Sequence, residues 1–430
     1  MDNAHIVIAT VGSLGDLFPF LAIGQELQRR GHRVTVATHA IHQDAIERAG
    51  LAFANASGMA EPEDRAAFTT QAFHPWRGPR FVVHDVAAMD VRASYEKLAP
   101  VCIAADVLIT TTLAFAGQIL GETLSAQGRL RWLSAVLAPA GFISAFDPPA
   151  MGIAPLDAFI RRSSRRGRRL RRVAEWVTHS WTQPVREFRA ERGLSPQSAL
   201  GDPFHHGQHA PQGVLALFSP LLGRPQPDWP TPVRITGFAR YAQAMELDPA
   251  LAVFLDAGPA PLVFTLGSAA VHIGVDFLRE SLAAAVQLKQ RAVLLTGSAE
   301  LRAQLPVALP PSVHAIDYAS HSALFPRASV IVHHGGIGTS SEALRSGRPM
   351  LVVPHGFDQP DNAARLQRLG VAEVLPANRY RAIRALPLLQ KLMTTTNYSD
   401  RAEVCRHVLH AENGARGAAD VIEEVINNRA

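Results

Sequence analysis

The sequence predicts an α/β protein built from two doubly wound parallel sheets that face each other across a cleft. Three observations indicate this architecture. The chain opens with a strand, a helix and a strand, the same order restarts near residue 261, and a glycine turn at residues 333–339 joins a strand to a helix. In such sheets the crossovers are right-handed and ligands bind at the carboxyl ends of the strands.

The first half of the chain supplies the first sheet. Residues 20–32 place apolar side chains at helical spacing up to Gly31. Residues 140–209 lose strand periodicity and predict helices and loops. The strand patterns of this half lie at residues 5–11, 34–38, 106–112 and 131–139.

The second half repeats the order after a proline-rich stretch. Prolines stiffen an extended segment, so residues 223–241 are predicted to link two domains. We expect an N-terminal domain over 1–222, a second domain over 242–411 and a final segment over 412–430. The strand patterns of the second domain lie at residues 262–266, 292–296, 313–316, 330–332 and 350–353.

The composition is that of a folded globular protein. The 430 residues are 47% hydrophobic and 18% charged, and the length suits two domains of about 200 residues each. No apolar run reaches the roughly 18 residues of a membrane span, and we expect no signal peptide. Cys102 and Cys405 lie far apart and support neither a disulfide scaffold nor a zinc site, so we expect a cytoplasmic location.

Positive charge is concentrated in one short run. The net charge is +5, and residues 161–172 read RRSSRRGRRLRR. Clustered arginines near a membrane attract anionic lipid by about 1 kcal/mol each, which makes peripheral membrane contact one interpretation. A solvated loop is the other. Because the arginines are not interleaved with aromatic side chains along a groove, we expect no nucleic-acid partner.

Residues 330–362, VIVHHGGIGTSSEALRSGRPMLVVPHGFDQPDN, hold most of the functional information. Glycines at a strand-to-helix turn let backbone N–H groups approach an anion, and the helix N-terminus adds partial positive charge. A second strand ends at Pro354 and is followed by Asp358 and Gln359, so two strand ends bring polar groups together. The pattern predicts a diphosphate site that needs no metal.

This segment resembles the donor-binding signature of the family 1 glycosyltransferases. A lone glycine loop would be weak evidence, but a set at these spacings is rarely found by chance. The resemblance implies the GT-B fold, two Rossmann-like domains with a cleft between them and a C-terminal helix, residues 417–428, that packs back towards the first domain. The matching residues are His334, Gly336, Gly338, Thr339, Glu342, Gly347, Pro349, Pro354, Asp358, Gln359 and Asn362.

The resemblance also implies how the donor is bound. His334 and the backbone amides after it would stabilise the departing diphosphate, and a tight turn around a buried histidine is the alternative. Glu342, one helical turn further on, would accept hydrogen bonds from both hydroxyls of a ribose. Asp358 and Gln359 resemble the pair that holds sugar hydroxyls. The residues of the diphosphate site are His334, Gly336, Gly338 and Thr339.

Two shorter segments complete the predicted donor site. Tyr318, Ala319 and His321 fall where relatives carry a W-A-P-Q segment, in which an aromatic ring covers the base and the next residue's backbone hydrogen-bonds it. Tyrosine keeps the stacking face, whereas His321 replaces the glutamine. Gly267 and Ser268 follow a strand and match a G-S pair near the diphosphate.

The catalytic base is expected from the first domain, across the cleft. Asp16 lies in the turn TVGSLGDLFPF, which resembles the bacterial and sterol-modifying branches of the family. The neighbouring Gly15 is assigned to donor binding. We assign Asp16 as the base that deprotonates an acceptor hydroxyl, with a pKa raised by Phe18 and Phe20. The alternative is that Asp16 N-caps the following helix. The turn lacks G-x-G-x-x-G, which disfavours a dinucleotide site.

Residues 134–149 and 212–238 resemble the rhamnosyltransferase branch of rhamnolipid synthesis, which uses dTDP-rhamnose. Glu342 instead favours UDP, whose ribose keeps its 2′-hydroxyl. We therefore expect an inverting, metal-independent transfer of a hexose, glucose or rhamnose, from a UDP- or dTDP-sugar to a hydroxyl of a hydrophobic lipid or natural product, without another cofactor. The acceptor pocket is assigned to Phe18, Phe142 and Phe146. For each of them, a place in the hydrophobic core is the alternative.

Two other functions are compatible with the same fold. A sugar-nucleotide epimerase or a phosphorylase would use the same donor site. A non-catalytic partner of a glycosyltransferase would have no need to keep the predicted site intact.

Overall fold

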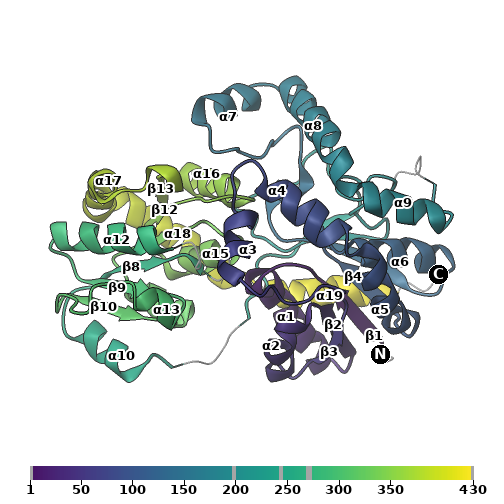
Figure 1. The fold of residues 1–430 in the computed structure, drawn as a ribbon, viewed down its shortest axis with the longest axis horizontal. Helices are drawn as coiled ribbons and strands as arrows, with labels where there is room; N and C mark the ends of the chain where they lie inside the picture. The colour runs from purple at the N-terminus through teal and green to yellow at the C-terminus, as the bar shows by residue number, and fades with distance from the viewer. Residues whose placement is uncertain (1–2, 196–199, 242–245, 268–273, 428–430) are drawn as a thin grey trace.

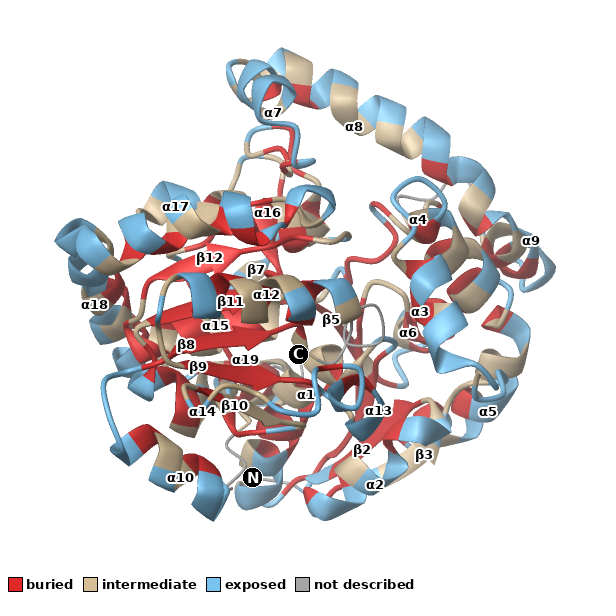
Figure 2. Cartoon of the chain, turned by 60° about the vertical axis from the view of Figure 1, so that its left-hand side comes forward, coloured by how far each residue is buried: buried red, intermediate tan, exposed pale blue. Residues whose placement is uncertain are grey.

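Two parallel sheets, one in each half of the chain, organise the molecule (Figure 1). This is a computed structural model that describes residues 3–195, 200–241, 246–267 and 274–427. The predicted α/β class with two doubly wound sheets is confirmed. Figure 2 shows the inner strands of the sheets buried and the outer faces of the surrounding helices exposed.

The N-terminal sheet has the strand order β3-β2-β1-β4-β5-β6-β7. The order reverses next to β1, which pairs with β2 on one side and with β4 on the other. A crevice forms where the order reverses, so the loop after β1 is the expected place for chemistry. The strands are β1 (His5–Ala9), β2 (Arg33–Thr38), β3 (Ala52–Asn55), β4 (Val107–Thr110), β5 (Arg131–Val136), β6 (Val214–Ala216) and β7 (Val233–Ile235).

The C-terminal sheet has the order β10-β9-β8-β11-β12-β13 and reverses between β8 and β11. The loops that follow β8 and β11 therefore flank one crevice. The strands are β8 (Leu262–Thr265), β9 (Ala292–Leu295), β10 (Val313–Ile316), β11 (Val330–His333), β12 (Met350–Val352) and β13 (Ala372–Val374).

Helices cover both sheets, and none in the part of the chain that the structure describes is long and apolar enough to cross a membrane. Those of the first half are α1 (Leu14–Arg29), α2 (Gln43–Arg48), α3 (Arg65–Ala72), α4 (Gly78–Arg80), α5 (Val91–Ile103), α6 (Phe115–Ala126), α7 (Ala154–Arg161), α8 (Ser164–His179) and α9 (Gln183–Glu191). Those of the second half are α10 (Pro249–Asp256), α12 (Val275–Gln287), α13 (Ala299–Arg302), α14 (His321–Leu324), α15 (Ile337–Ser346), α16 (Gln359–Leu369), α17 (Ala382–Thr394), α18 (Thr396–Ala411) and α19 (Gly414–Asn427).

Two elements differ from the sequence prediction. Helix α1 begins at Leu14, not near Phe20, because a capping box at Ser13 starts it and Pro19 is tolerated inside it. The proline-rich stretch 223–241 contains β7, which pairs in parallel with β6. Part of the predicted linker is therefore the edge strand of the first sheet.

The chain crosses between the domains twice. It leaves the first domain after β7, and it returns between α18, which packs on α15, and α19, which packs on α1. Ile422 of α19 is buried with Ile6 and Phe20 in the N-terminal core. The two crossings touch, since a Cβ on Gly414 would lie 2.4 Å from the carbonyl oxygen of Gly237.

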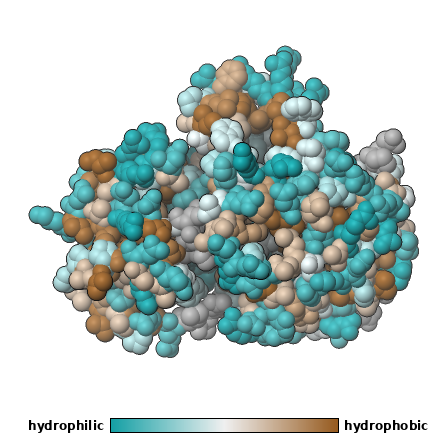
Figure 3. Space-filling model, viewed as in Figure 1, coloured by the Kyte–Doolittle hydropathy of each residue, from teal (hydrophilic) through white to brown (hydrophobic). Residues whose placement is uncertain are grey.

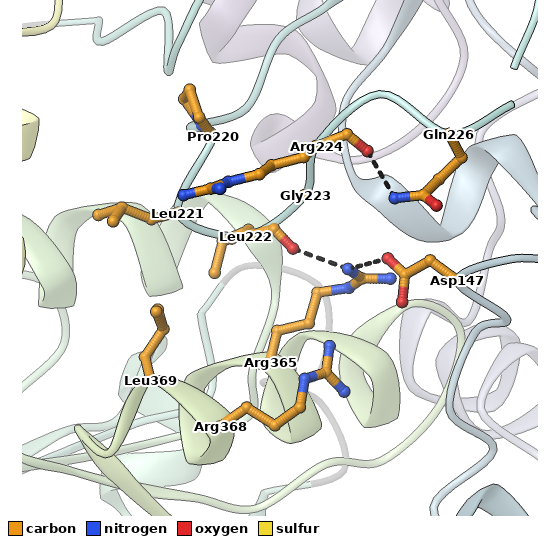
Figure 4. Close-up of a pocket in the computed structure, with 10 residues that line it drawn as sticks. All are labelled: Asp147, Pro220, Leu221, Leu222, Gly223, Arg224, Gln226, Arg365, Arg368 and Leu369. Carbon is orange, nitrogen blue, oxygen red and sulfur yellow. Dashed lines mark hydrogen bonds and ion pairs between the residues drawn. The ribbon is translucent and has the colours of Figure 1, made fainter. Parts of the chain in front are cut away.

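A buried ionic network joins the domains at α16 (Figure 4). Arg365 donates to Asp361 on the same helix (Nε to Oδ2, 2.6 Å), and to Asp147 of the first domain (Nη1 to Oδ2, 2.6 Å). The same Nη1 reaches the carbonyl oxygen of Leu222 at 2.7 Å. Asp361 also accepts the backbone N–H of Ala150 at 3.0 Å, so the segment before α7 is fastened to the second domain.

Candidate functional site

The turn between β1 and α1 holds the predicted base. Asp16 is the third residue of α1 and completes the capping box: the backbone N–H and the hydroxyl of Ser13 both donate to Asp16 Oδ2, at 2.8 and 3.1 Å. Ser13, not Asp16, is the N-cap. The N–H of Gly15 donates to Ser13 Oγ at 3.3 Å, so that donor is already used within the turn.

The Asp16 carboxyl has a raised pKa. Burial is the main cause, and it outweighs the Ser13 hydrogen bonds and the nearby His42, which favour the charged form. A carboxylate with a raised pKa is a better proton acceptor for an alcohol. The capping role and the electrostatic requirement of a general base therefore coexist in one side chain.

His42 is a neighbour that no sequence pattern indicated. It follows β2, is 7% exposed, and donates from Nε2 to the carbonyl oxygen of Gly12 at 3.0 Å. Burial lowers the pKa of His42, while the hydrogen bond to Gly12 and the charge of Asp16 oppose that shift. The hydrogen bond to Gly12 holds the β1–α1 turn. Its place at a strand's carboxyl end was the available signal.

The turn between β11 and α15 forms the predicted anion site. Helix α15 begins at Ile337, and its N-cap, Gly336, provides no side-chain hydrogen bond to the first turn. The first N–H groups of the helix are therefore available to an anion. Thr339 lies in this first turn and is 9% exposed.

His334 packs into the centre of this turn. It is 4% exposed, and burial lowers its pKa well below the usual range, so the ring is neutral. Its Nδ1 is buried without a hydrogen-bond partner among the described residues. Gly267, with φ +63°, comes from the loop after β8, and a Cβ there would lie 2.6 Å from His334 Cε1. The loops after β8 and β11 thus meet at His334. Ser268, the other residue of the predicted G-S pair, lies outside the described residues.

The loop after β12 brings Asp358 and Gln359 to the same place. Asn362 ties this loop to the glycine turn, because its Nδ2 donates both to Asp358 Oδ2 (2.8 Å) and to the carbonyl oxygen of Gly335 (3.0 Å). Gln359 Oε1 accepts the N–H of His355 at 2.8 Å, so the amide oxygen is already used within the loop.

Asp16 and Asp358 lie across the interdomain cleft from each other. The pKa of Asp358 is raised to about 7: burial is the main cause, the hydrogen bond from Asn362 acts against it, and the negative charge of Asp16 adds to it. Helices α1 and α15 are also in contact. The predicted base and the predicted sugar-binding carboxyl are therefore close enough to interact.

Glu342 has a partner that the sequence did not indicate. Arg240, which follows β7, donates from Nε to Glu342 Oε1 at 3.1 Å. The next residue, Tyr241, packs its ring on Phe18 of α1, with centroids 5.5 Å apart. The segment after β7 thus links the predicted ribose carboxylate to the helix that carries Asp16.

The residues predicted to bind the nucleobase of the donor differ in their exposure to solvent. Tyr318 is 53% exposed, and its pKa is raised by burial and by the charge of Glu342, which places the two on one side of the site. Ala319 is buried. His321 stacks on Phe325 with centroids 4.3 Å apart, and burial lowers its pKa to about 4, so its ring is packed within the protein.

The predicted acceptor aromatics differ in their surroundings. Phe142 lies in the hydrophobic core, the alternative given with its assignment to the pocket, and it stacks on Trp229 with centroids 4.0 Å apart. Phe146 is exposed and Phe18 is partly buried against Tyr241. An interdomain aromatic contact joins Phe73 of the first domain to Phe357 of the second, with ring centroids 5.1 Å apart.

Two other features bear on the chemistry. Within the described ranges, no group of three or more His, Cys, Asp or Glu side chains is arranged to hold a metal ion. A crevice of about 300 Å³ lies at the domain junction, but it is lined by residues 220–226 and the later part of α16, including Arg365 and Arg368, away from the glycine turn (Figure 4).

Gly336 and Gly338 form a matched pair for testing the turn. A Cβ at Gly336 would lie 2.4 Å from His334 Nε2, whereas a Cβ at Gly338 would meet no atom within 4 Å. We expect Gly336→Ala to lower the unfolding free energy by about 1–3 kcal/mol, as overpacking does. Gly338→Ala should leave it unchanged or raise it by up to about 1 kcal/mol. Urea unfolding of both variants measures this, and equal midpoints would contradict the close packing at His334.

Comparisons with known proteins point to one class of enzyme. The profile of the glycosyltransferase family 28 N-terminal domain matches residues 6–138, and that of the erythromycin biosynthesis protein CIII-like C-terminal domain matches residues 279–424. The chain is 30% identical to O-mycaminosyltylonolide 6-deoxyallosyltransferase of Streptomyces fradiae, over 99% of this chain and 98% of that one. It is 27% identical to a sterol 3-beta-glucosyltransferase of Arabidopsis thaliana, over 96% of this chain, and it spans 64% of that relative's length.

Solved structures share the fold. The glycosyltransferase of kitacinnamycin matches with a TM-score of 0.67 and 24% identity, over 99% of this chain and all of that one. A spinosyn rhamnosyltransferase complexed with thymidine diphosphate matches with a TM-score of 0.68 and 18% identity, again over 99% of this chain and 100% of that one. The architecture is the GT-B arrangement of two α/β domains.

Proposed function

Because this chain belongs to the family 1 glycosyltransferases, we propose that it transfers a hexose, glucose or rhamnose, from a UDP- or dTDP-sugar to a hydroxyl of a hydrophobic lipid or natural product, with inversion and without a metal. That it is a glycosyltransferase which uses nucleotide sugars follows from its relatives. One observation carries the finer proposal: Asp16 of the first domain lies opposite Asp358 and the glycine turn of the second.

The proposed reaction is a single displacement. Asp16 takes the proton of the acceptor hydroxyl as that oxygen bonds to the anomeric carbon from the side opposite the diphosphate. The bond from the anomeric carbon to the diphosphate oxygen breaks, and the leaving oxygen keeps the electron pair. The N–H groups at the start of α15 and a hydrogen bond from the neutral His334 stabilise the negative charge. Attack from the opposite face inverts the anomeric carbon.

The nucleoside is assigned to the side of the glycine turn that carries Tyr318 and Glu342. Two relatives of the same fold were solved with thymidine diphosphate, which favours dTDP. The Glu342 carboxylate favours UDP, since a ribose offers two hydroxyls to it. In the proposal the ribose replaces Arg240 as the partner of Glu342.

A thermal-shift panel with UDP, dTDP and GDP tests this donor site. A ligand that binds only the folded state at 100 times its Kd raises the unfolding free energy by about 2.7 kcal/mol. We expect Glu342→Gln to weaken UDP binding about tenfold or more, the effect of losing a hydrogen bond to a charged group, and to change dTDP binding less. Arg240→Gln is the matched control, because it breaks the same ion pair but keeps the carboxylate. Stabilisation by dTDP and not by UDP would overturn the ribose role of Glu342.

The acceptor is proposed to be hydrophobic. The aromatic contact of Phe73 with Phe357 and that of Phe18 with Tyr241 put apolar surface near the cleft. The macrolide and sterol transferases among the relatives have acceptors of this kind by name. Peripheral membrane contact through residues 161–172, one of the two interpretations of that run, suits such an acceptor.

A further inference from the structure

Helix α8 carries a stripe of arginines that the proposed reaction does not use. Arg165, Arg169, Arg172 and Trp176 are spaced four, three and four residues apart, so they lie along one face of the helix, and all four are exposed. Trp176 is 79% exposed. Among the described residues no ion-pair partner lies next to these three arginines.

The opposite face of α8 holds the helix on the protein. A Cβ on Gly167 would lie 2.0 Å from the carbonyl oxygen of Ala145, so the helix touches that backbone. Arg171 reaches Glu175 at 3.3 Å and Asp228 at 3.5 Å, and Thr178 Oγ1 lies 2.8 Å from His205 Nε2. The stripe is therefore fixed outward. It lies on a helix and not in a loop, which was the alternative from the sequence.

Helix α7 places apolar side chains beside this charge. Ile153, Leu156 and Phe159 are exposed at a spacing of three residues, and Arg166 of α8 lies 3.7 Å from the Phe159 ring centroid. Figure 1 shows α7 and α8 projecting from the body of the molecule, and Figure 3 shows apolar and hydrophilic residues side by side at that end. Val173 extends the apolar part along α8.

We propose that α7 and α8 dock the protein on an anionic lipid bilayer, with the arginine stripe against the headgroups and Trp176 at the interface. Charge complementarity selects this occupant: a row of unpaired guanidinium groups attracts an anionic surface. Neighbouring exposed apolar and aromatic side chains enter the headgroup boundary, as they do in interfacial helices. The surface does not depend on which sugar or acceptor the enzyme uses.

Sedimentation of the full chain with vesicles tests the proposal. The wild type should bind vesicles of phosphatidylcholine mixed with phosphatidylglycerol, should not bind pure phosphatidylcholine, and should bind less at high salt. R165Q/R169Q/R172Q should bind about 100-fold more weakly, from about 1 kcal/mol for each arginine. The matched control is R379Q/R384Q/R401Q. It removes the same number of positive charges from exposed positions of the second domain.

Trp176 supplies a second readout. Its fluorescence should shift to the blue when anionic vesicles are added, and W176F should lose that shift, while W76F, which removes a tryptophan that is 86% exposed on another element, should keep it. Equal binding by both triple variants would overturn the proposal. So would binding to a soluble polyanion such as heparin without binding to vesicles. R165Q/R169Q/R172Q should still transfer sugar to a water-soluble acceptor. Loss of vesicle binding in this variant can therefore be distinguished from a failure of the proposed function.

Discussion

Replacing Asp16 with Asn is expected to lower kcat by roughly 100- to 10,000-fold, the range over which a general base contributes. The amide oxygen can still accept from Ser13, so the capping box and the fold should persist. Nucleotide binding should be unchanged because the residues assigned to the nucleoside, Tyr318 and Glu342, lie in the other domain. Transfer rates measured in the presence of EDTA, with the anomeric configuration of the product read by NMR, check the base, the metal independence and the inversion together.

Ser13→Ala is the control for this variant. It removes the cap hydroxyl and costs about 1 kcal/mol of stability, but it leaves the Asp16 carboxylate in place. It should therefore remain active. In the wild type, kcat should rise with pH through a value above 3.8, because burial raises the pKa of Asp16 and only its deprotonated form accepts the proton. Turnover in Asp16→Asn at the wild-type rate would rule out the base assignment.

Replacing Arg365 with Met is expected to lower the unfolding free energy by about 3–5 kcal/mol, the effect of removing one partner from a buried ion pair. Burial disfavours the charge on Arg365, but Asp361 and Asp147 outweigh it and raise its pKa. Without Arg365, the carboxyl of Asp361, which is 1% exposed, would lose its closest cation. Urea unfolding at neutral pH measures the loss.

Two further variants make the Arg365 result specific. Arg327→Gln breaks an exposed pair with Asp256 and should change stability by less than about 1 kcal/mol. The double variant Arg365→Met/Asp361→Asn should recover part of the lost unfolding free energy, because the second substitution removes the carboxylate of Asp361 that the first leaves unpaired. A midpoint for Arg365→Met within error of the wild type would show that the network does not stabilise the domain junction.

The sequence predicted the elements whose signals are local. The strand that leads into Gly336 and the helix that carries Glu342 lie in one continuous segment, so their spacing already defines a turn. The three-residue strands β7 and β13 were missed because a charged residue interrupts each of them, whereas the equally short β12 is continuously apolar. The early start of α1 was missed because Pro19 resembles a helix boundary.

The contacts between domains could not be predicted in the same way. Arg240 and Glu342 are 102 residues apart in the chain, and Arg365 and Asp147 are 218 apart. Nothing in either local pattern distinguishes these side chains from solvated ones, since their pairing depends on how two separate sheets are oriented. The stacking partner of Phe142 could not be predicted for the same reason, because Trp229 belongs to a distant segment.

The return of α19 to the first domain also determines how this enzyme could be recombined with its relatives. A new donor specificity cannot be grafted by joining two halves at a single point, because α19 would then come from the wrong parent and would have to fill the hydrophobic surface of α1. A chimera needs two junctions, one after β7 and one before Gly414, where the crossings already touch. The C-terminal domain is, in engineering terms, an insertion within the N-terminal domain.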